Sequence, residues 1–264
     1  MNGIFLIAKN SLKEALRQKL IFMVLIVAVA LTLFSTWAST LDLGSGHLQF
    51  VGNFTAGALG FFGAVIAIVS TCQLFYAEIE NKTVWTLLAR PVGRLGFIGG
   101  KLLGEIFMIY IFVSVVMLAG AVSMALAQAR LDAIPEEFFM GGRPHVDWLG
   151  FAAFGFLQGA KLAAIAAMAM FVCAASRSMM FAVVASFMVC AASAISYSEF
   201  FSGGSFWLDC AILLIPNFSI FEPSLNFAFE GANCAQFFAA LGYGAVYILA
   251  FLMLGVWAFR SREI

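Results

Sequence analysis

Long apolar runs separated by polar connections dominate the sequence. A helix needs about 20 apolar residues to cross a bilayer. Six runs come close to that length or exceed it, and they cover residues 20–38, 54–76, 102–127, 149–175, 179–197 and 238–259. Because lipid offers the backbone no hydrogen-bond partners, each run is expected to be helical. The pattern predicts an all-α membrane protein with six transmembrane helices in one domain, residues 1–264.

The residues before the first run have a helical pattern of their own. Apolar side chains recur on one side, at Phe5, Ala8, Leu12, Leu16 and Leu20. The other side carries Lys9, Lys13, Arg17 and Gln18. This arrangement predicts an amphipathic helix over residues 1–19 that lies along the inner membrane surface. A basic flank that only sets the topology is the alternative.

Composition agrees with a chain that is embedded in lipid. Hydrophobic residues make up 63% of the 264 residues and charged residues 11%, whereas a soluble domain carries about 25% charged residues. The mean hydropathy is +1.02. The formal net charge is +0, which disfavours nucleic acid as a partner.

The positive charges predict the orientation. With the N-terminus inside, the inner segments hold most of the Lys and Arg residues: Lys9, Lys13, Arg17, Lys19, Lys82, Arg90, Arg94, Lys101, Arg177, Arg260 and Arg262. The outer connections hold only Arg130 and Arg143. By the positive-inside rule, both termini are expected to be cytoplasmic.

Six charged residues gather in the connection over residues 77–101: Glu78, Glu80, Lys82, Arg90, Arg94 and Lys101. Glu78 and Lys82 have the favourable i, i+4 order for a helix, and Pro91 should end that helix near Arg90. Its apolar side would carry Trp85, Leu87 and Leu88, which suits docking into a partner's groove. From the spacing alone, a plain topological connection is equally open.

Lys161 is predicted to lie deep within the fourth run, one turn after Gln158. An ionisable residue at that depth is by default a hypothesis of function. Gln158 and Lys161 are therefore possible pathway residues that contact an anionic or polar substrate. The alternative is a long side chain that reaches the interface. Glu105 is expected to pair with Lys101 at i, i+4 and to lie too far inward to neutralise Lys161.

Stripes of small residues predict close helix packing. They comprise Gly96, Gly100 and Gly104; Ala56, Gly60 and Ala64; and Gly155, Gly159, Ala163 and Ala167. Contacts within the chain are the favoured reading, and a dimer face is the alternative.

Residues suited to catalysis or cofactor binding are sparse. The stretch before Leu102 resembles a P-loop, but Leu95 replaces its first glycine and Leu102 its Ser or Thr. His47 and His145 lack neighbours at ligand spacing, and the five cysteines form no C-x-x-C. Cys210 and Cys234 have a disulfide as one possibility, with free thiols favoured. We therefore expect no enzyme and no cofactor or metal bound by this chain.

Three stretches carry a family resemblance. "EIENKTVWTLLARPVGRLGFIGGKLLGE", from Glu78 to Glu105, resembles the signature region of the type 2 ABC exporter permeases, the membrane subunits of ATP-binding-cassette transporters. "AKNSLKEALRQKL", from Ala8 to Leu20, is similar to their N-terminal connecting helix. "LIPNFSIF", from Leu214 to Phe221, resembles a Pro-Asn segment between their last two spans.

The resemblance implies a bacterial inner-membrane permease that dimerises with a second copy or a paralogue and binds cytoplasmic ABC-type ATPase subunits, which hold ATP and Mg. The connection 77–101 would contain the coupling helix, with Glu78, Glu80, Arg90 and Arg94 meeting the ATPase. Residues 198–237 would form an outer re-entrant segment with short helices in the outer leaflet. A non-transporting anchor or assembly subunit with the same fold is the alternative function. A secondary transporter ranks third, because internal repeats and paired intramembrane carboxylates are missing.

Overall fold

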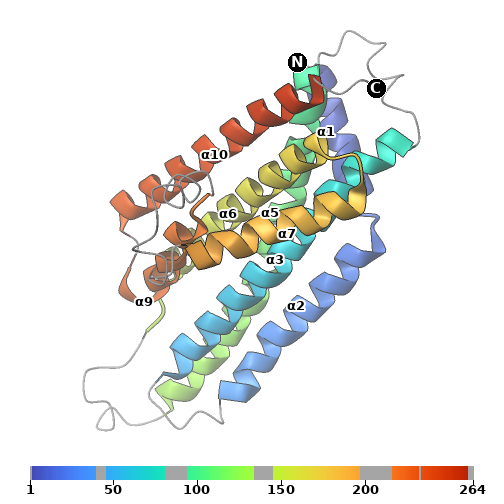
Figure 1. The fold of residues 1–264 in the computed structure, drawn as a ribbon. Helices are drawn as coiled ribbons and strands as arrows, with labels where there is room; N and C mark the ends of the chain where they lie inside the picture. Colours follow the sequence, from blue (N-terminus) through green and yellow to red (C-terminus); the bar gives the residue numbers. More distant parts are fainter. Residues whose placement is uncertain are drawn as a thin grey trace.

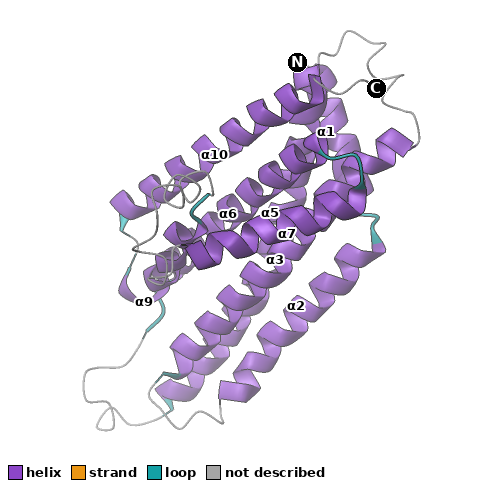
Figure 2. Cartoon of the chain, viewed as in Figure 1, coloured by secondary structure: helices purple, strands orange, loops and turns teal. Residues whose placement is uncertain are grey.

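A computed structural model describes most of the chain, namely residues 2–39, 46–80, 94–133, 145–196, 216–231 and 233–260. Within these ranges every regular element is a helix and no strand occurs (Figure 2). The predicted all-α class is therefore confirmed for the described part of the chain.

Five helices are long and apolar enough to cross a bilayer. They are α2 (Lys19–Ala38), α3 (His47–Glu80), α5 (Arg94–Asp132), α6 (Trp148–Ala175) and α10 (Cys234–Arg260). The protein is therefore membrane-embedded. The run predicted as the fifth span is α7 (Met179–Ser196), which is apolar but shorter. Six transmembrane helices consequently stay a prediction.

Helix α6 lies at the centre of the bundle (Figure 1). It packs against α3, α5, α7 and α10, and nearly all of its side chains from Phe154 to Ala174 are buried or half-buried. Its many alanines and glycines allow several neighbouring helices to approach closely. Helix α2 packs on α3 and α5, while α10 rests mainly on α6 and leaves much of its surface exposed.

Three short helices occupy opposite ends of the bundle. Helix α1 (Asn2–Ala15) packs on α5 near the last turns of α10, at what we call the α1 end (Figure 1). The 3₁₀ helix η4 (Phe218–Asn226) and α9 (Phe227–Glu230) pack against α6 towards the other end, the α9 end. Residues 81–93 lie between α3 and α5 in the sequence and are outside the described part of the chain.

Side-chain caps define several helix starts. The carboxylate of Asp147 accepts a hydrogen bond from the amide of Leu149 at the start of α6, at 3.1 Å. Asn217 accepts one from Ser219 at the start of η4, and Asn233 accepts one from Ala235 at the start of α10. Such caps satisfy amides that a helix leaves unpaired. Gly231, with a φ of 90°, ends α9 in a backbone conformation that favours glycine.

Polar side chains of α5 hold α2 in place. The hydroxyl of Ser123 donates to the carbonyl of Thr32 at 3.0 Å, and Arg130 donates to the carbonyl of Thr36 at 3.2 Å. Arg130 was predicted to lie in a connection after the third run, but α5 continues to Asp132, so Arg130 lies in its last turn. The helix extends because Gln128 and Arg130 are good helix formers.

Candidate functional site

Helix α1 packs very closely on α5 at Gly104. A Cβ atom built on Gly104 would lie 2.6 Å from the carbonyl oxygen of Ala8 and 2.8 Å from Cβ of Ser11. The face of α1 that is buried here consists of Ala8, Ser11 and Ala15. Small residues on both helices thus bring the two backbones together, as small-residue stripes do in membranes.

The outer face of α1 is basic, as predicted, because Lys9 and Lys13 are exposed. Arg17, which was expected on the same helix, is exposed in the turn after α1 ends at Ala15. The predicted apolar face has two parts in the structure, one packed on the bundle and one exposed. Ala8 is buried and Leu12 half-buried, but Phe5 is 68% exposed and Leu16 is exposed as well. The close approach at Gly104 leaves room only for small side chains, so the large apolar residues of α1 point away from the bundle.

A buried polar cluster joins α3 to α5 near the α1 end. We call it the Lys101 cluster; it contains Ser70, Leu74, Lys101 and Glu105. The ammonium of Lys101 donates to the carbonyl of Leu74, and the hydroxyl of Ser70 donates to a carboxylate oxygen of Glu105 at 3.1 Å. Lys101 is 1% exposed and Glu105 0%. The described hydrogen bonds of the two side chains go to Leu74 and Ser70 on α3, so the expected direct pairing of Lys101 with Glu105 stays a prediction.

Aromatic rings surround the Lys101 ammonium. It lies 5.3 Å from the ring centroid of Phe97 and 6.0 Å from that of Phe75. Phe259, in the last turns of α10, contacts both of these rings. A desolvated cation over aromatic faces is stabilised by their quadrupoles. The cluster therefore fixes three helices, α3, α5 and α10, at one end of the bundle.

A second set of contacts joins α3 to α6 at the same end. The hydroxyl of Tyr76 donates to the carbonyl oxygen of Ser176 at 2.9 Å and lies at the same distance from the hydroxyl of Ser176. One turn away, the sulfur atoms of the free cysteines Cys72 and Cys173 are 3.1 Å apart. The last turns of α3 are therefore held by both α5 and α6.

Most of the predicted coupling residues fall outside the described part of the chain. Lys82, Trp85, Leu87, Leu88, Arg90 and Pro91 lie in the undescribed range 81–93. Glu78 and Glu80 belong to the last turn of α3, and Arg94 is the first residue of α5. What the structure describes is the pair of helices that flank this segment, together with the cluster that ties them.

The second polar site is centred on Lys161, near the middle of α6. We call it the Lys161 site; it contains Gln158, Lys161, Cys190 and Glu222. Gln158 and Lys161 share one side of α6 because they are three residues apart. Gln158 is 4% exposed, while Lys161 and Cys190 are half-buried. Glu222 follows Phe221, which packs against Leu157 and Ala160 just before Lys161 in α6, and Cys190 belongs to α7, which also packs on α6. Both residues are close enough for the charge of Lys161 to act on them.

Hydrogen bonds and packing hold η4 over this site. The hydroxyl of Ser193, in α7, donates to the carbonyl of Pro216 at 2.6 Å and accepts from the amide of Phe218 at 3.3 Å. The hydroxyl of Tyr243, in α10, accepts from the amide of Asn217 at 2.7 Å. Fully buried Phe221 packs in a cluster with Leu157 and Ala160 of α6. These contacts hold η4, and with it Glu222, against the part of α6 that immediately precedes Lys161.

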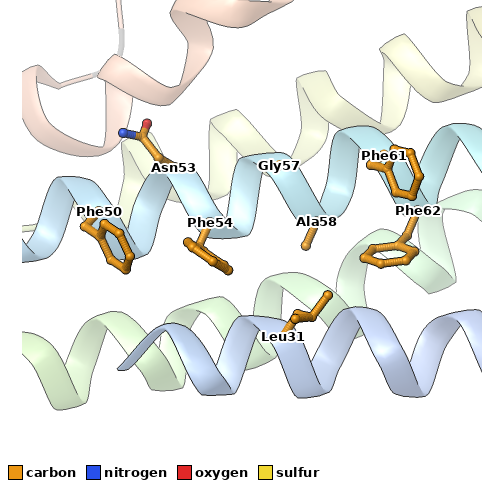
Figure 3. Close-up of a pocket in the computed structure, with 8 residues that line it drawn as sticks. All are labelled: Leu31, Phe50, Asn53, Phe54, Gly57, Ala58, Phe61 and Phe62. Atoms are coloured by element: carbon orange, nitrogen blue, oxygen red, sulfur yellow. The ribbon is translucent and has the colours of Figure 1, made fainter. Parts of the chain in front are cut away.

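Two hollows complete the described surface. A groove of about 470 Å³ runs beside α3, with Leu31 of α2 on its far wall (Figure 3). Its lining is apolar except for the amide of Asn53, so it suits contact with lipid chains. A polar pocket of about 280 Å³ lies at the α9 end, with Asn226, Glu230, Asn233 and Gln236 in its lining. The predicted site residues lie outside both hollows.

Sequence reasoning missed Glu222 as the partner of Lys161, and it missed Ser70 and Leu74 as partners of the Lys101 cluster. The membrane depth of Lys161 was the available signal, since buried ions require a counter-charge or carbonyl. Lys101 was expected in the connection 77–101, so its burial within α5 was not foreseen. In the part of the chain that the structure describes, no three His, Cys, Asp or Glu residues gather into a metal-binding group. Cys234 is an exposed free thiol, and Cys210 lies outside the described residues.

Comparison of the sequence with protein-family models and with curated proteins gives no match. The function is therefore argued from the two polar sites and the packing around them.

Proposed function

We propose that this protein is the transmembrane permease subunit of an ATP-binding-cassette exporter. A separate cytoplasmic ATPase subunit would grip the α1 end of the bundle, and its closure would move substrate across the membrane. In this proposal the chain binds no nucleotide itself and is not an enzyme. It would dimerise with a second permease in a bacterial inner membrane, with both termini on the cytoplasmic side.

The buried Lys101 cluster is the observation that carries the proposal. Charges buried within a membrane helix are costly and are kept where function needs them. This pair ties α3 to α5 just where the chain leaves one helix and enters the other through residues 81–93. A force applied to that segment would reach both helices as one unit, because a packed core transmits displacement.

Helix α1 supports the same proposal. Its backbone is locked on Gly104, one residue before Glu105, so it is attached directly to the clamped part of α5. Its exposed Lys9 and Lys13, and Arg17 in the turn that follows, offer positive charge to a protein surface or to anionic lipid head groups. A partner that contacts α1 and residues 81–93 would therefore act on one rigid body.

The test combines charge reversal with ATP turnover. The Glu78→Lys/Glu80→Lys double variant and wild type are purified from native membranes with their ATPase, and vanadate-sensitive ATP hydrolysis is measured. We expect the double variant to insert normally yet to lose the bound ATPase. Glu230→Lys, a charge reversal at the α9 end, should retain the bound ATPase.

An ATPase that stays bound to the double variant would refute the role of these two carboxylates, and wild type without any ATPase would refute the proposed function. ATP hydrolysis without movement of any solute would favour the anchor subunit.

A further inference from the structure

The Lys161 site holds one cation, one carboxylate and one unsatisfied amide oxygen in the middle of the bundle. The Oε1 atom of Gln158 is buried and accepts no hydrogen bond from the described residues. A buried acceptor without a donor destabilises the folded protein, because the oxygen has lost its hydrogen bonds to water. The site is therefore incomplete without a further group that donates a hydrogen bond.

The site is also open on one side. Lys161 and Cys190 are half-buried, and Glu222 is exposed on η4. By contrast, Phe221 beside Glu222 is fully buried against α6 and lies 3.3 Å from a Cβ atom built on Gly244 of α10. The backbone of η4 is thus fixed by its neighbours while its carboxylate remains free to meet a ligand.

The charges of the site select the class of ligand. The formal charges of Lys161 and Glu222 sum to zero, and Gln158 is neutral. An anion would be attracted by Lys161 but repelled by Glu222. A cation would be attracted by Glu222 but repelled by Lys161. A net charge left in the low-dielectric interior is expensive. A ligand with separated positive and negative groups satisfies both residues at once.

We propose that the Lys161 site binds a zwitterionic group that carries a primary ammonium. Its anionic part would contact Lys161, its ammonium would contact Glu222, and an N–H of the same ammonium would donate to Gln158. An ethanolamine phospholipid head group and a free amino acid or peptide share this chemistry. The idea that the exported substrate is such a ligand rests on the proposed function. The idea that the site binds such a ligand does not.

Cys190 provides a direct readout because its thiol belongs to the site, while Cys234 at the α9 end provides an internal control. The full chain in a non-ionic detergent is labelled with N-ethylmaleimide, and modification of each cysteine is followed by peptide mass spectrometry. The probes are dihexanoyl phosphatidylethanolamine, glycylglycine, and the anionic dihexanoyl phosphatidylglycerol. No ATP and no ATPase are present, so failure here leaves the ATPase proposal untouched.

We expect phosphatidylethanolamine or glycylglycine to slow the labelling of Cys190 and to leave Cys234 unchanged. Protection by the lipid alone would identify a head group, and protection by the dipeptide alone a free zwitterion. In Lys161→Met and Glu222→Gln, half-protection should need at least about tenfold more probe, as for loss of a charged hydrogen bond. Glu230→Gln, a neighbouring exposed carboxylate, should behave as wild type.

Three results would overturn the inference. They are an absence of protection by both zwitterions, equal protection by phosphatidylglycerol, or protection that is unchanged in Glu222→Gln. Glu222 is exposed, so this substitution keeps the fold even if Lys161→Met does not. The rate at Cys234 checks that each variant is intact.

Discussion

The close approach of α1 to α5 can be tested with a single methyl group. Gly104→Ala places a Cβ atom 2.6 Å from the carbonyl oxygen of Ala8. Both contacting atoms belong to or lie next to helix backbone, so neither can rotate away. Gly99→Ala is the matched control on the same helix, because its Cβ atom would meet only Leu252, at an ordinary 3.8 Å.

The expected magnitude follows from the difference between the two variants. Each substitution gains up to about 1 kcal/mol of helix propensity in α5, and this gain cancels in the comparison. Only Gly104→Ala adds the cost of overpacking, about 1–3 kcal/mol. The docked state of α1 should be destabilised by that amount, which corresponds to roughly 5- to 150-fold faster local opening.

Hydrogen exchange measured by mass spectrometry reports this opening directly. Amides of the peptide that covers α1 should exchange faster in Gly104→Ala than in Gly99→Ala, while α6 should be unchanged in both. If the two variants give the same exchange in α1, the close packing at Gly104 is wrong, and with it the attachment of α1 to the clamped helix.

Three further predictions concern the contacts of α3. Copper phenanthroline should link Cys72 to Cys173, detected as a cross-linked peptide pair, because their sulfur atoms are 3.1 Å apart; if the two peptides stay separate, α3 and α6 do not meet there. Tyr76→Phe should lower the free energy of unfolding by about 1 kcal/mol, since it removes a hydrogen bond to Ser176; an unchanged denaturant midpoint would contradict this. Lys101→Met should lower the free energy of unfolding by about 1–3 kcal/mol, because it leaves the buried carbonyl of Leu74 without its donor; an unchanged denaturant midpoint would argue against this contact.

Hydropathy predicted the membrane helices well because lipid imposes a length and a composition on each of them. It was less informative about their ends. Helices α3 and α5 run beyond the predicted 54–76 and 102–127 at both ends, since polar residues such as Gln49 and Arg130 continue a helix outside the apolar run. Helix α7, by contrast, matches the predicted run 179–197 to within one residue.

Periodicity did not show which residues of the apolar side of α1 pack on the bundle. The apolar side of a helix is expected to face its neighbours, but Gly104 on another helix makes small residues the better fit. The small-residue stripes were similarly ambiguous. Gly155 and Gly159 do pack on α5, at Met117 and Tyr110, whereas a Cβ atom on Gly60 would meet nothing within 4 Å. A stripe predicts close packing without specifying where a partner lies.

For the polar sites, too, positions along one helix could be predicted from the sequence, whereas partners on other elements could not. That Lys101 and Glu105 share one side of α5 followed from their i, i+4 spacing. The partner of Lys161 did not, because Glu222 reaches it only through the folding of η4 against α6, α7 and α10. Spacing rules cover one helix turn, whereas a counter-charge from another element depends on the tertiary fold.

Cross-linking to the ATPase tests the central claim most directly. Lys13→Cys puts a thiol on the exposed face of α1, and native Cys234 presents one at the opposite end. In membranes that contain the native complex, a bifunctional thiol reagent should join position 13 to an ATP-binding-cassette ATPase and leave Cys234 unlinked to it. A cross-link from Cys234 instead, or none from position 13 while the complex hydrolyses ATP, would contradict energy input at the α1 end.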